Sequence, residues 1–333
     1  MTKTKVAVIG LGGIAQLVHL PYLTRIENVE ITAVADVNKS RLITIADKFN
    51  IKERYKDHNE LLANSDTGTI IIATPTNTHK EIAIACLKAN RDVLVEKPLA
   101  RTYNESKQIV DAAKKYKRKI MVGMNLRYRP DAMILKSLVS AGEIGQPFYI
   151  KCGWLKRQSS SQKWFTKKEE SGGGVIIDLS ILLLDMALWL LNFPPIISVT
   201  AQSYYHNTKT VEDTSVSFLR CADSSCINIE SSWSLSREND FFYFDVYGTK
   251  GSASLNPFQI HKKIEDQLID LTPSQNENAL NLFKKSYMNE LKSFIGAVNG
   301  LNPVFSSADD SLSRMEVIEA MYKSSAQKKE IKL

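Results

Sequence analysis

A short apolar segment that runs directly into a glycine turn constrains the fold of this chain more than any other feature. Residues 6–9 read Val-Ala-Val-Ile, and Gly10-Leu11-Gly12-Gly13-Ile14-Ala15 and a helical pattern follow them. This G-x-G-x-x-G/A spacing predicts a strand, a tight turn and a helix. Gly10 permits the turn, Gly12 lets the backbone approach a pyrophosphate, and Ala15 lets the helix lie close to the strand. Free N–H groups at the start of the helix would then face the phosphates.

A carboxylate at the end of the next apolar segment supports the same interpretation. The segment Ile31–Ala35 ends in Asp36, at the distance from the turn where an acid accepts hydrogen bonds from the adenine ribose hydroxyls. Such a carboxylate would repel a 2′-phosphate, so NAD is favoured over NADP, although Arg41 could neutralise that phosphate. Alternatively, Asp36 is the N-cap of a helix that starts near Lys39.

Strand and helix patterns alternate regularly through the first third of the chain. Further apolar segments lie at residues 69–73, 92–95 and 120–122. Continuous Val/Ile runs separated by helices predict a parallel sheet that is covered on both faces. Ligands bind such sheets beyond the carboxyl ends of the strands. Because Gly10, Asp36, Thr74 and Lys97 all fall at strand ends, we expect them at one edge of the sheet.

The predicted cofactor-binding residues cluster at these strand ends. They are Gly10, Leu11, Gly12, Gly13, Ile14, Asp36, Arg41, Thr74, Pro75, Asn77, His79, Glu96 and Lys97. Two of them have simpler explanations: His79 could be a solvated residue at a helix N-terminus, and Lys97 a surface lysine in a turn before proline.

Bulk properties indicate a globular protein with small-molecule ligands. The 333 residues suffice for two domains, and 44% are hydrophobic and 24% charged. No signal peptide is visible, and the four cysteines lack a C-x-x-C pair, so we expect reduced thiols and a cytoplasmic protein. The net charge of +7 suits an anionic substrate. The basic residues form no stripe with aromatics, so we expect neither a nucleic-acid nor a membrane partner.

The pattern changes near residue 125, which divides a predicted first domain, residues 1–124, from a second, residues 125–333. The second domain shows alternating strands from about residue 196, as in an antiparallel sheet. Its apolar stretch Val175–Leu191 contains Asp178 and Asp185, which favours a buried helix over a membrane span. Positions 178, 182 and 185 should share one helix face, where both carboxylates need hydrogen bonds or a polar cavity.

Together these residues resemble the Gfo/Idh/MocA oxidoreductase family, over nearly the whole chain. The resemblance lies in Val8-Ile9-Gly10-Leu11-Gly12, Val34-Ala35-Asp36, Thr74-Pro75-Thr76-Asn77-Thr78-His79, Glu96-Lys97-Pro98, Arg127, Gly142-Glu143-Ile144-Gly145, Trp164-Phe165, Gly172-Gly173-Gly174, Asp178, Asp185 and Tyr247-Gly248-Thr249-Lys250-Gly251. It implies an α/β chain with an N-terminal Rossmann domain and a C-terminal α+β domain with an open, mostly antiparallel sheet. It also implies a homodimer or homotetramer that pairs through the C-terminal sheet.

The resemblance also implies roles for individual residues. Lys97 and Asp178 would be catalytic, and Lys97 would contact the reacting hydroxyl and orient it or help to deprotonate it. Lys97, Asp178, Arg127 and Trp164 would bind the substrate, although an interdomain salt bridge is an alternative for Arg127. The peptide bond before Pro98 is expected to be cis. Tyr287 is a more remote candidate for a proton donor.

One departure from the family pattern bears on catalysis. The family reads D-x-G-x-H-x-x-D across the second-domain helix, whereas this chain has Ser180 in place of the glycine and Leu182 in place of the histidine. Leucine cannot transfer a proton, and a positioned general base is worth about 10²–10⁴ in rate. Three hypotheses follow: another group moves the proton in a sugar or polyol dehydrogenase, the enzyme reduces a ketosugar, or the protein binds NAD and a sugar as a regulator.

The sequence thus predicts reversible hydride transfer between NAD and a carbinol or keto carbon of a sugar, nucleotide sugar or cyclitol. Retention of Lys97 and Asp178 favours an enzyme over a regulatory protein. No spacing of histidines or cysteines predicts a metal site.

Overall fold

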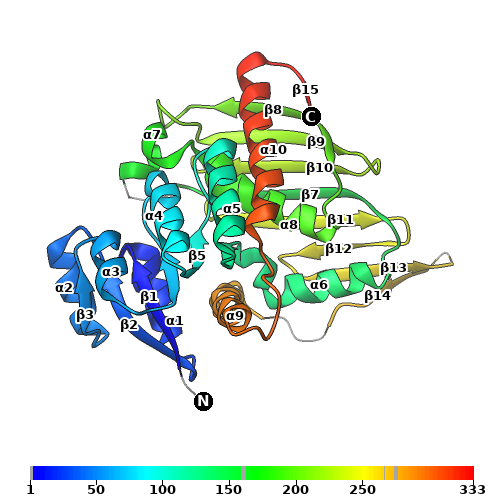
Figure 1. Cartoon of the computed structure of the whole chain (residues 1–333). Helices are drawn as coiled ribbons and strands as arrows, with labels where there is room; N and C mark the ends of the chain where they lie inside the picture. The colour runs from blue at the N-terminus through cyan, green and yellow to red at the C-terminus, as the bar shows by residue number, and fades with distance from the viewer. Residues whose placement is uncertain (1–2, 159–162, 266, 274–276) are drawn as a thin grey trace. The chain divides into compact units, whose positions relative to one another are not determined.

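The computed structural model describes residues 3–158, 163–265, 267–273 and 277–333, and these form two compact units (Figure 1). Unit 1 comprises Met1–Asn125 and Tyr287–Ser313, and unit 2 comprises Leu126–Ser286 and Arg314–Leu333. The first boundary lies within one residue of the predicted one. Residues 287–313 differ from the prediction, because they pack with the first unit although they follow the second in sequence.

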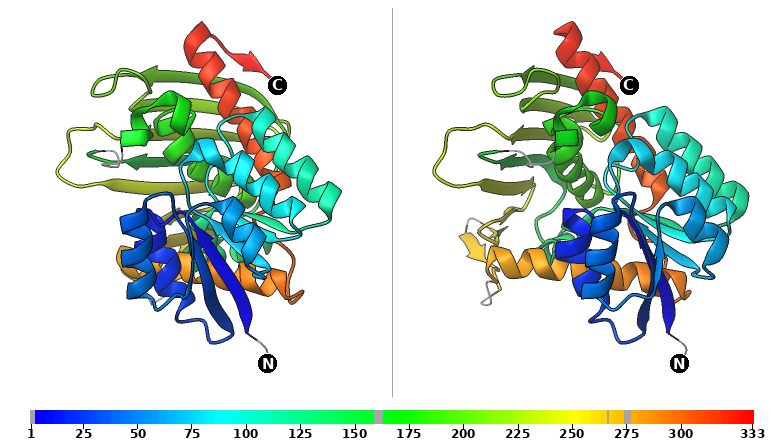
Figure 2. Two further views of the ribbon diagram at one scale, coloured as in Figure 1. Left: turned by 60° about the vertical axis from the view of Figure 1, so that its left-hand side comes forward. Right: turned by 90° about the vertical axis from the view of Figure 1, so that its left-hand side faces the viewer.

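Unit 1 is built on a parallel sheet with helices on both faces (Figure 2). Its strands are β1 (Thr4–Ile9), β2 (Val29–Ala35), β3 (Glu53–Tyr55), β4 (Thr69–Ile72), β5 (Asp92–Glu96) and β6 (Ile120–Gly123). Their spatial order is β3-β2-β1-β4-β5-β6, and all pairs are parallel. This is the doubly wound dinucleotide-binding order, in which the strand order reverses between β1 and β4. The predicted Rossmann domain is confirmed.

The helices between these strands agree with the predicted alternation. They are α1 (Leu20–Leu23), α2 (Lys39–Lys48), α3 (His58–Asn64), α4 (Thr76–Lys88) and α5 (Tyr103–Tyr116). A π-helical turn, Ala15–His19, stands between the glycine turn and α1. The N-cap of α2 is Asn38, whose side chain accepts a hydrogen bond from the Arg41 N–H, so the alternative role of Asp36 as this cap is wrong.

Unit 2 contains a nine-stranded sheet in the order β14-β13-β12-β11-β7-β10-β9-β8-β15. The strands are β7 (Pro147–Leu155), β8 (Ile196–Tyr204), β9 (Thr214–Cys221), β10 (Cys226–Ser232), β11 (Phe241–Gly248), β12 (Gly251–Leu255), β13 (Gln259–Ile264), β14 (Gln267–Asp270) and β15 (Ile331–Lys332). Only β7 and β10 pair in parallel among these described strands, so the predicted mostly antiparallel sheet is confirmed.

Helices cover one face of this sheet (Figure 1). The remaining helices of the chain are α6 (Pro130–Ser140), α7 (Lys168–Ser171), α8 (Ile181–Leu190), α9 (Ala279–Val298) and α10 (Ala308–Gln327). The helical stretch Lys168–Leu190 is long and apolar enough to cross a membrane, but 94% of its apolar window is buried inside the protein. The prediction of a buried helix is therefore confirmed.

The helix that carries the two aspartates begins with a π-helical turn, Ile176–Ser180, which continues into α8. In this turn the Ile181 N–H bonds to the Ile176 carbonyl, five residues back. The i, i+4 rule therefore fails across it. Asp178 is half-buried, whereas Leu182 and Asp185 lie in the interior, so the predicted common face does not extend over the whole helix.

Close packing explains the glycine run before this helix. A Cβ on Gly174 would lie 1.9 Å from the Glu212 carbonyl oxygen, and one on Gly173 would lie 1.9 Å from the Tyr322 hydroxyl. Gly172 has a φ of +88° and ends α7. The run is thus required by contacts within unit 2.

We expect Gly174→Ala to lower the free energy of unfolding by about 1–3 kcal/mol or more, because the new methyl group must displace backbone. Gly68→Ala is the matched control, since a Cβ there meets no atom within 4 Å. Urea denaturation of both variants tests this difference. Equal stability of the two variants would contradict the packing explanation.

Candidate functional site

The glycine turn lies where the strand order of unit 1 reverses. Gly10 has a φ of +89°, and a Cβ on it would lie 2.7 Å from the Ala73 carbonyl oxygen at the end of β4. By contrast, a Cβ on Gly12 or Gly13 would meet nothing within 4 Å. The turn therefore needs Gly10 for its own geometry, and leaves open space in front of the next two glycines. That space fits the close approach of a pyrophosphate.

Asp36 is fixed beside this turn. Its Oδ2 accepts a hydrogen bond of 2.8 Å from the Leu11 N–H, and its Oδ1 accepts one of 2.7 Å from the Asn38 N–H. Arg41 adds a two-pronged ion pair, from Nε to Oδ2 at 2.8 Å and from Nη2 to Oδ1 at 2.7 Å. The predicted cofactor residues Leu11, Asp36 and Arg41 are thus brought together at the ends of β1 and β2.

Lys97 follows β5 at the same edge of the sheet and is half-buried. The bond between Lys97 and Pro98 is cis, as the resemblance implied. The Lys97 N–H donates to Oε2 of Glu96 at 3.3 Å, and Oε1 of Glu96 accepts a bond of 2.7 Å from buried His19. Burial opposes the ionisation of Glu96, but the hydrogen bond from His19 and the nearby positive charges outweigh it and lower its pKa. Glu96 is therefore an internal support for the Lys97 turn.

His79 lies in the interior with 1% exposure, so the alternative of a solvated residue is wrong. Its Nδ1 lies 2.9 Å from the Pro98 carbonyl oxygen and its Nε2 lies 2.9 Å from that of Thr74. Burial lowers the pKa of His79, although both carbonyl contacts favour the charged ring. Both nitrogens face backbone, so His79 joins the ends of β4 and β5 and does not offer a free nitrogen to a cofactor.

The other predicted residues of this edge surround the start of α4. Thr74 and Pro75 are half-buried, and Asn77 is exposed on the first turn of the helix. Thr74 accepts a hydrogen bond of 2.7 Å from the Thr78 hydroxyl. Ile14 is half-buried beside the open glycines.

In unit 2, Asp178 combines a fixed position with access to solvent. Every other residue from 173 to 190 is buried, and all of this run is described. The Asp178 Oδ2 accepts a hydrogen bond of 3.1 Å from Nε1 of buried Trp233. The π-helical turn therefore presents one carboxylate from an otherwise apolar helix. Such turns occur frequently at functional sites.

The structure contradicts the predicted substrate contact of Arg127. Its side chain is 1% exposed and grips Asp185 with two hydrogen bonds, from Nε at 2.7 Å and from Nη2 at 2.6 Å. Arg314 forms a further ion pair of 2.6 Å with the same carboxylate. Because all three residues belong to unit 2, this is an internal ion cluster and not the interdomain bridge considered as an alternative. The predicted need of Asp185 for specific partners is confirmed.

The remaining candidates in the second half occupy varied places. Trp164 is half-buried in a short 3₁₀ turn, Lys163–Thr166, with its ring 4.1 Å from that of Phe165. Leu182 is 4% exposed. Ser180 is also buried, and its hydroxyl lies 2.5 Å from that of Ser231. Tyr287 lies within α9, half-buried, and belongs to unit 1.

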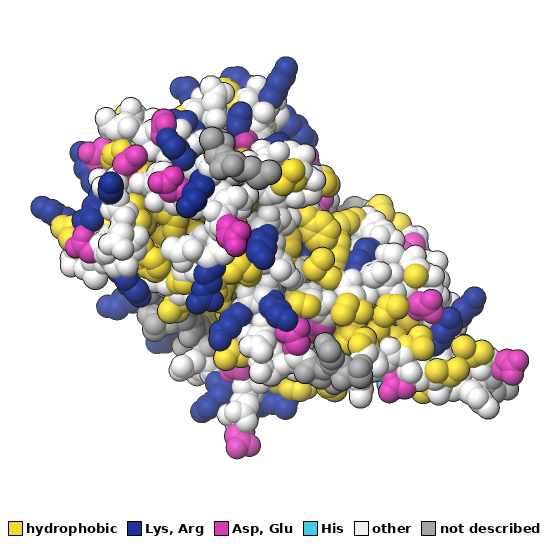
Figure 3. All heavy atoms as spheres, turned by 90° about the horizontal axis from the view of Figure 1, so that it is seen from below, with side chains coloured by type: hydrophobic (Ala, Val, Ile, Leu, Met, Phe, Trp, Pro, Cys, Tyr) yellow, Lys and Arg dark blue, Asp and Glu magenta, His cyan; other side chains and the backbone are white. Residues whose placement is uncertain are grey.

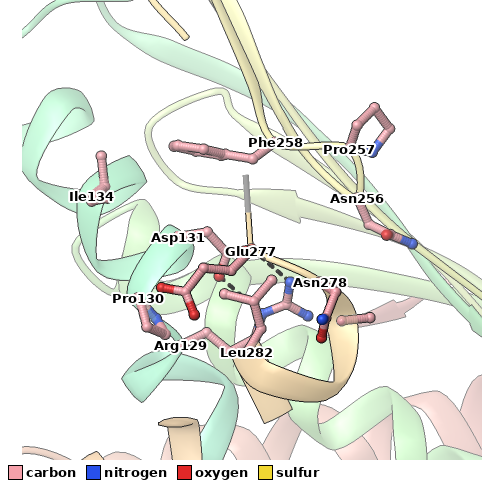
Figure 4. A pocket seen from close by; sticks show the side chains of 11 residues that line it. Arg129, Pro130, Asp131, Ile134, Asn256, Pro257, Phe258, Glu277, Asn278 and Leu282 are labelled. Atoms are coloured by element: carbon pink, nitrogen blue, oxygen red, sulfur yellow. Dashed lines mark hydrogen bonds and ion pairs between the residues drawn. The ribbon is translucent and has the colours of Figure 1, made fainter. Parts of the chain in front are cut away.

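A cavity of about 270 Å³ lies elsewhere in unit 2, between α6, the β12–β13 turn and the start of α9 (Figure 4). Its charged groups are satisfied internally, because Arg129 pairs with Asp131 at 2.6 Å and Glu277 pairs with Lys285 at 2.6 Å. The stick view shows Phe258 and Ile134 along its apolar side. None of the predicted site residues lines this cavity.

Sequence reasoning missed four residues that support the predicted site: His19, Trp233, Glu212 and Arg314. His19 lies four residues after Ala15 of the glycine motif, but a single histidine in a helical pattern gave no sign of its partner. Glu212 is buried and accepts hydrogen bonds from the Gly174 and Ile176 N–H groups at 3.0 and 2.9 Å. It thereby caps the helix of Asp178, with the Tyr322 hydroxyl donating to it at 2.8 Å. A cap from a loop that is distant in sequence leaves no local sequence signal.

Family comparisons agree with this geometry. Residues 4–124 match an oxidoreductase family described by its NAD-binding Rossmann fold, and residues 136–333 match the C-terminal alpha/beta domain of the same family. The chain belongs to the Gfo/Idh/MocA oxidoreductase family. The family's dinucleotide-binding fold is the one that unit 1 shows, and the open glycines fit NAD.

Individual relatives have low sequence identity to this chain, but they align with it over nearly its whole length. It is 26% identical to the D-glucoside 3-dehydrogenase of Escherichia coli K12, over 96% of this chain and 95% of the relative. It is also 26% identical to the myo-inositol 2-dehydrogenase of Thermotoga maritima, over 99% and 98%. The crystal structure of GenD2 from gentamicin A biosynthesis in complex with NAD superposes with a TM-score of 0.88 at 25% identity, over 100% and 97%.

The buried cap at Glu212 predicts a pH-dependent stability. Burial raises the pKa of Glu212 above its ordinary value of 4.5, so its contribution to folding is largest at low pH and is lost as the pH rises through the raised value. Glu212→Gln keeps an oxygen acceptor without the charge. We therefore expect the free energy of unfolding of Glu212→Gln, relative to that of the wild type, to increase between about pH 5 and about pH 8. Urea denaturation across this range measures the difference.

Two further variants control this test. Glu212→Ala should cost about 1–3 kcal/mol, because it leaves buried N–H groups without an acceptor. Glu238→Gln removes an exposed carboxylate from the same unit and should track the wild type at every pH. If the free energies of unfolding of Glu212→Gln and the wild type differed by the same amount at every pH, the raised pKa of Glu212 would be contradicted.

Proposed function

We propose that the chain is an NAD-dependent dehydrogenase or ketosugar reductase that acts on a sugar, nucleotide sugar or cyclitol. The observation that carries the proposal is the Lys97 turn, which is fixed by Glu96, His19 and His79 at the same sheet edge as the open glycines. A flexible surface lysine would not require two buried histidines behind it. The sugar and inositol dehydrogenases among the relatives support the substrate class.

In this proposal each unit has one task. Unit 1 binds the dinucleotide and supplies Lys97, and unit 2 binds the substrate and supplies Asp178. NAD, when bound, accepts or gives a hydride at the nicotinamide ring. The Lys97 ammonium hydrogen-bonds the substrate oxygen and holds the carbinol carbon for transfer, so positioning supplies much of the rate. Asp178 orients a neighbouring hydroxyl or takes up the proton.

The regulatory alternative rests on Leu182, which occupies the position where the family pattern has a proton-transferring histidine. Asp178 nevertheless remains accessible on its π-helical turn, and Lys97 remains fixed. A protein that only sensed the cofactor would not need either feature. We therefore favour the enzyme.

Lys97→Met tests the mechanism. It removes the ammonium group and keeps much of the side-chain volume, so turnover should fall by about 10²–10⁴ while the Kd for NAD changes little. Turnover is followed by the absorbance of reduced nicotinamide with a panel of sugars, nucleotide sugars and cyclitols, and the Kd by calorimetry. Lys88→Met, an exposed lysine on α4, is the control. Wild-type turnover in Lys97→Met would refute the mechanism.

We further propose a homodimer or homotetramer that pairs through the sheet of unit 2. On the face away from α8, Tyr149 stacks on Tyr247 at 5.5 Å between ring centroids, and the Lys151 ammonium lies 5.4 Å from the Tyr243 ring. Val216 on β9 adds an aliphatic side chain that is 42% exposed. Aromatic groups are enriched in protein interfaces.

Unit 2 carries a second exposed apolar surface. Figure 3 shows hydrophobic side chains gathered over the part of unit 2 that carries β13 and β14. The exposed apolar residues there and on the neighbouring helices are Met133, Ile134, Ile264, Leu268, Ile269, Leu280 and Phe283. A second contact surface of this kind would extend a dimer to a tetramer.

The free thiols of all four cysteines support a cytoplasmic location.

Val216→Lys with Tyr247→Lys should break the proposed sheet pairing, because each subunit would bring two additional cations into the interface. Light scattering after gel filtration should show the mass of the oligomer for the wild type and a smaller species for the variant. Lys107→Glu, on the exposed side of α5, changes the charge of unit 1 and should leave the mass unchanged. A monomeric wild type would contradict the proposal.

A further inference from the structure

The Asp36 carboxylate has no acceptor position left for a ligand. It accepts from the Leu11 N–H and the Arg41 Nε at one oxygen, and from the Asn38 N–H and the Arg41 Nη2 at the other, all between 2.7 and 2.8 Å. An ionised carboxylate offers about four lone-pair positions. The group expected to receive the adenine ribose hydroxyls is therefore fully occupied.

Arg41 is the partner that can leave. The Leu11 N–H belongs to the glycine turn and the Asn38 N–H to the N-cap of α2, so both are held by backbone geometry. The Arg41 side chain is 39% exposed, whereas that of Asp36 is 2% exposed. A guanidinium at this exposure can turn to water at little cost, and the carboxylate cannot move.

We propose that Arg41 is a specificity-determining residue that competes with the ribose of NAD for Asp36 and that, once released, is free to pair with a 2′-phosphate. This inference rests on the proposed function and refines its cofactor preference. If NAD were bound, Arg41 would give up one or both of its hydrogen bonds to Asp36, and the carboxylate would accept from the ribose hydroxyls instead. If NADP were bound, the released guanidinium would pair with the 2′-phosphate and offset its repulsion by Asp36.

Two effects of opposite sign follow from this competition. Removal of the guanidinium frees Asp36 for the ribose, so NAD should bind more tightly. It also removes the only cation that the geometry brings to this carboxylate among the described residues, so NADP should bind more weakly. A residue that merely attracted the dinucleotide phosphates would shift both affinities in the same direction.

The experiment measures the Kd of both dinucleotides by calorimetry for the wild type, Arg41→Gln and Arg41→Lys. For Arg41→Gln we expect about a three- to tenfold tighter Kd for NAD and about a tenfold weaker Kd for NADP. Arg41→Lys keeps the charge without the two-pronged geometry. It should therefore tighten NAD as well, while NADP stays close to the wild-type value.

Lys107→Gln is the control, because it removes one positive charge from an exposed helix of the same unit. A second measurement does not depend on affinities. The NMR signal of the Arg41 Nε–H, which is assigned by its loss in Arg41→Gln, should shift when NAD is added. The melting temperature of each variant shows that it is folded.

The outcomes separate this inference from the proposed function. If the wild type binds NAD but Arg41→Gln weakens NAD and NADP by the same factor, or changes neither, Arg41 is no competitor and the inference is overturned. If the wild type binds neither dinucleotide, the proposed function fails together with the inference. Opposite shifts for NAD and NADP support the competition.

Discussion

Parallel pairing of β1 with β2 on one side and β4 on the other is the constraint on which the candidate site depends. This pairing brings the ends of three strands to one edge, so that Gly10, Asp36 and Thr74 become neighbours although they are far apart in sequence. β5 joins the same edge and adds Lys97. Without this register the glycine turn would be an ordinary loop. The backbone of the sheet, more than any one side chain, therefore creates the place where a dinucleotide fits.

Buried hydrogen bonds then convert strand ends into fixed positions. Glu96 holds the N–H of Lys97 and is itself held by His19, and His79 holds the carbonyl of Pro98. In unit 2, Trp233 and Glu212 play similar parts for Asp178 and its helix. Each half of the molecule thus presents one chemically active side chain on a support whose polar atoms face inward. Such support limits the geometries that each of the two side chains can adopt.

Much of the fold could be predicted because its signals are local. The Val/Ile runs, the glycine spacing and the acid after the second strand each follow from the geometry of a single strand or turn. The apolar helix was predicted as buried for the same reason. The environment of Arg127 was not predictable, because its partners Asp185 and Arg314 come from segments far away in the chain. His79 was predicted to bind the cofactor, with a solvated residue at the helix start as the alternative, whereas two backbone carbonyls enclose its ring. A π-helical turn also changes the side of the helix on which Asp178 lies, and such a turn cannot be predicted from composition.

The ion cluster at Asp185 has a consequence for how the chain passes between its two units. The chain crosses from one unit to the other three times, at residues 125–126, 286–287 and 313–314. Arg127 lies just after the first crossing and Arg314 just after the last, and the same carboxylate binds both. Two of the three connections therefore enter the second unit at a common anchor, so neither can slide or loosen there without disturbing the other.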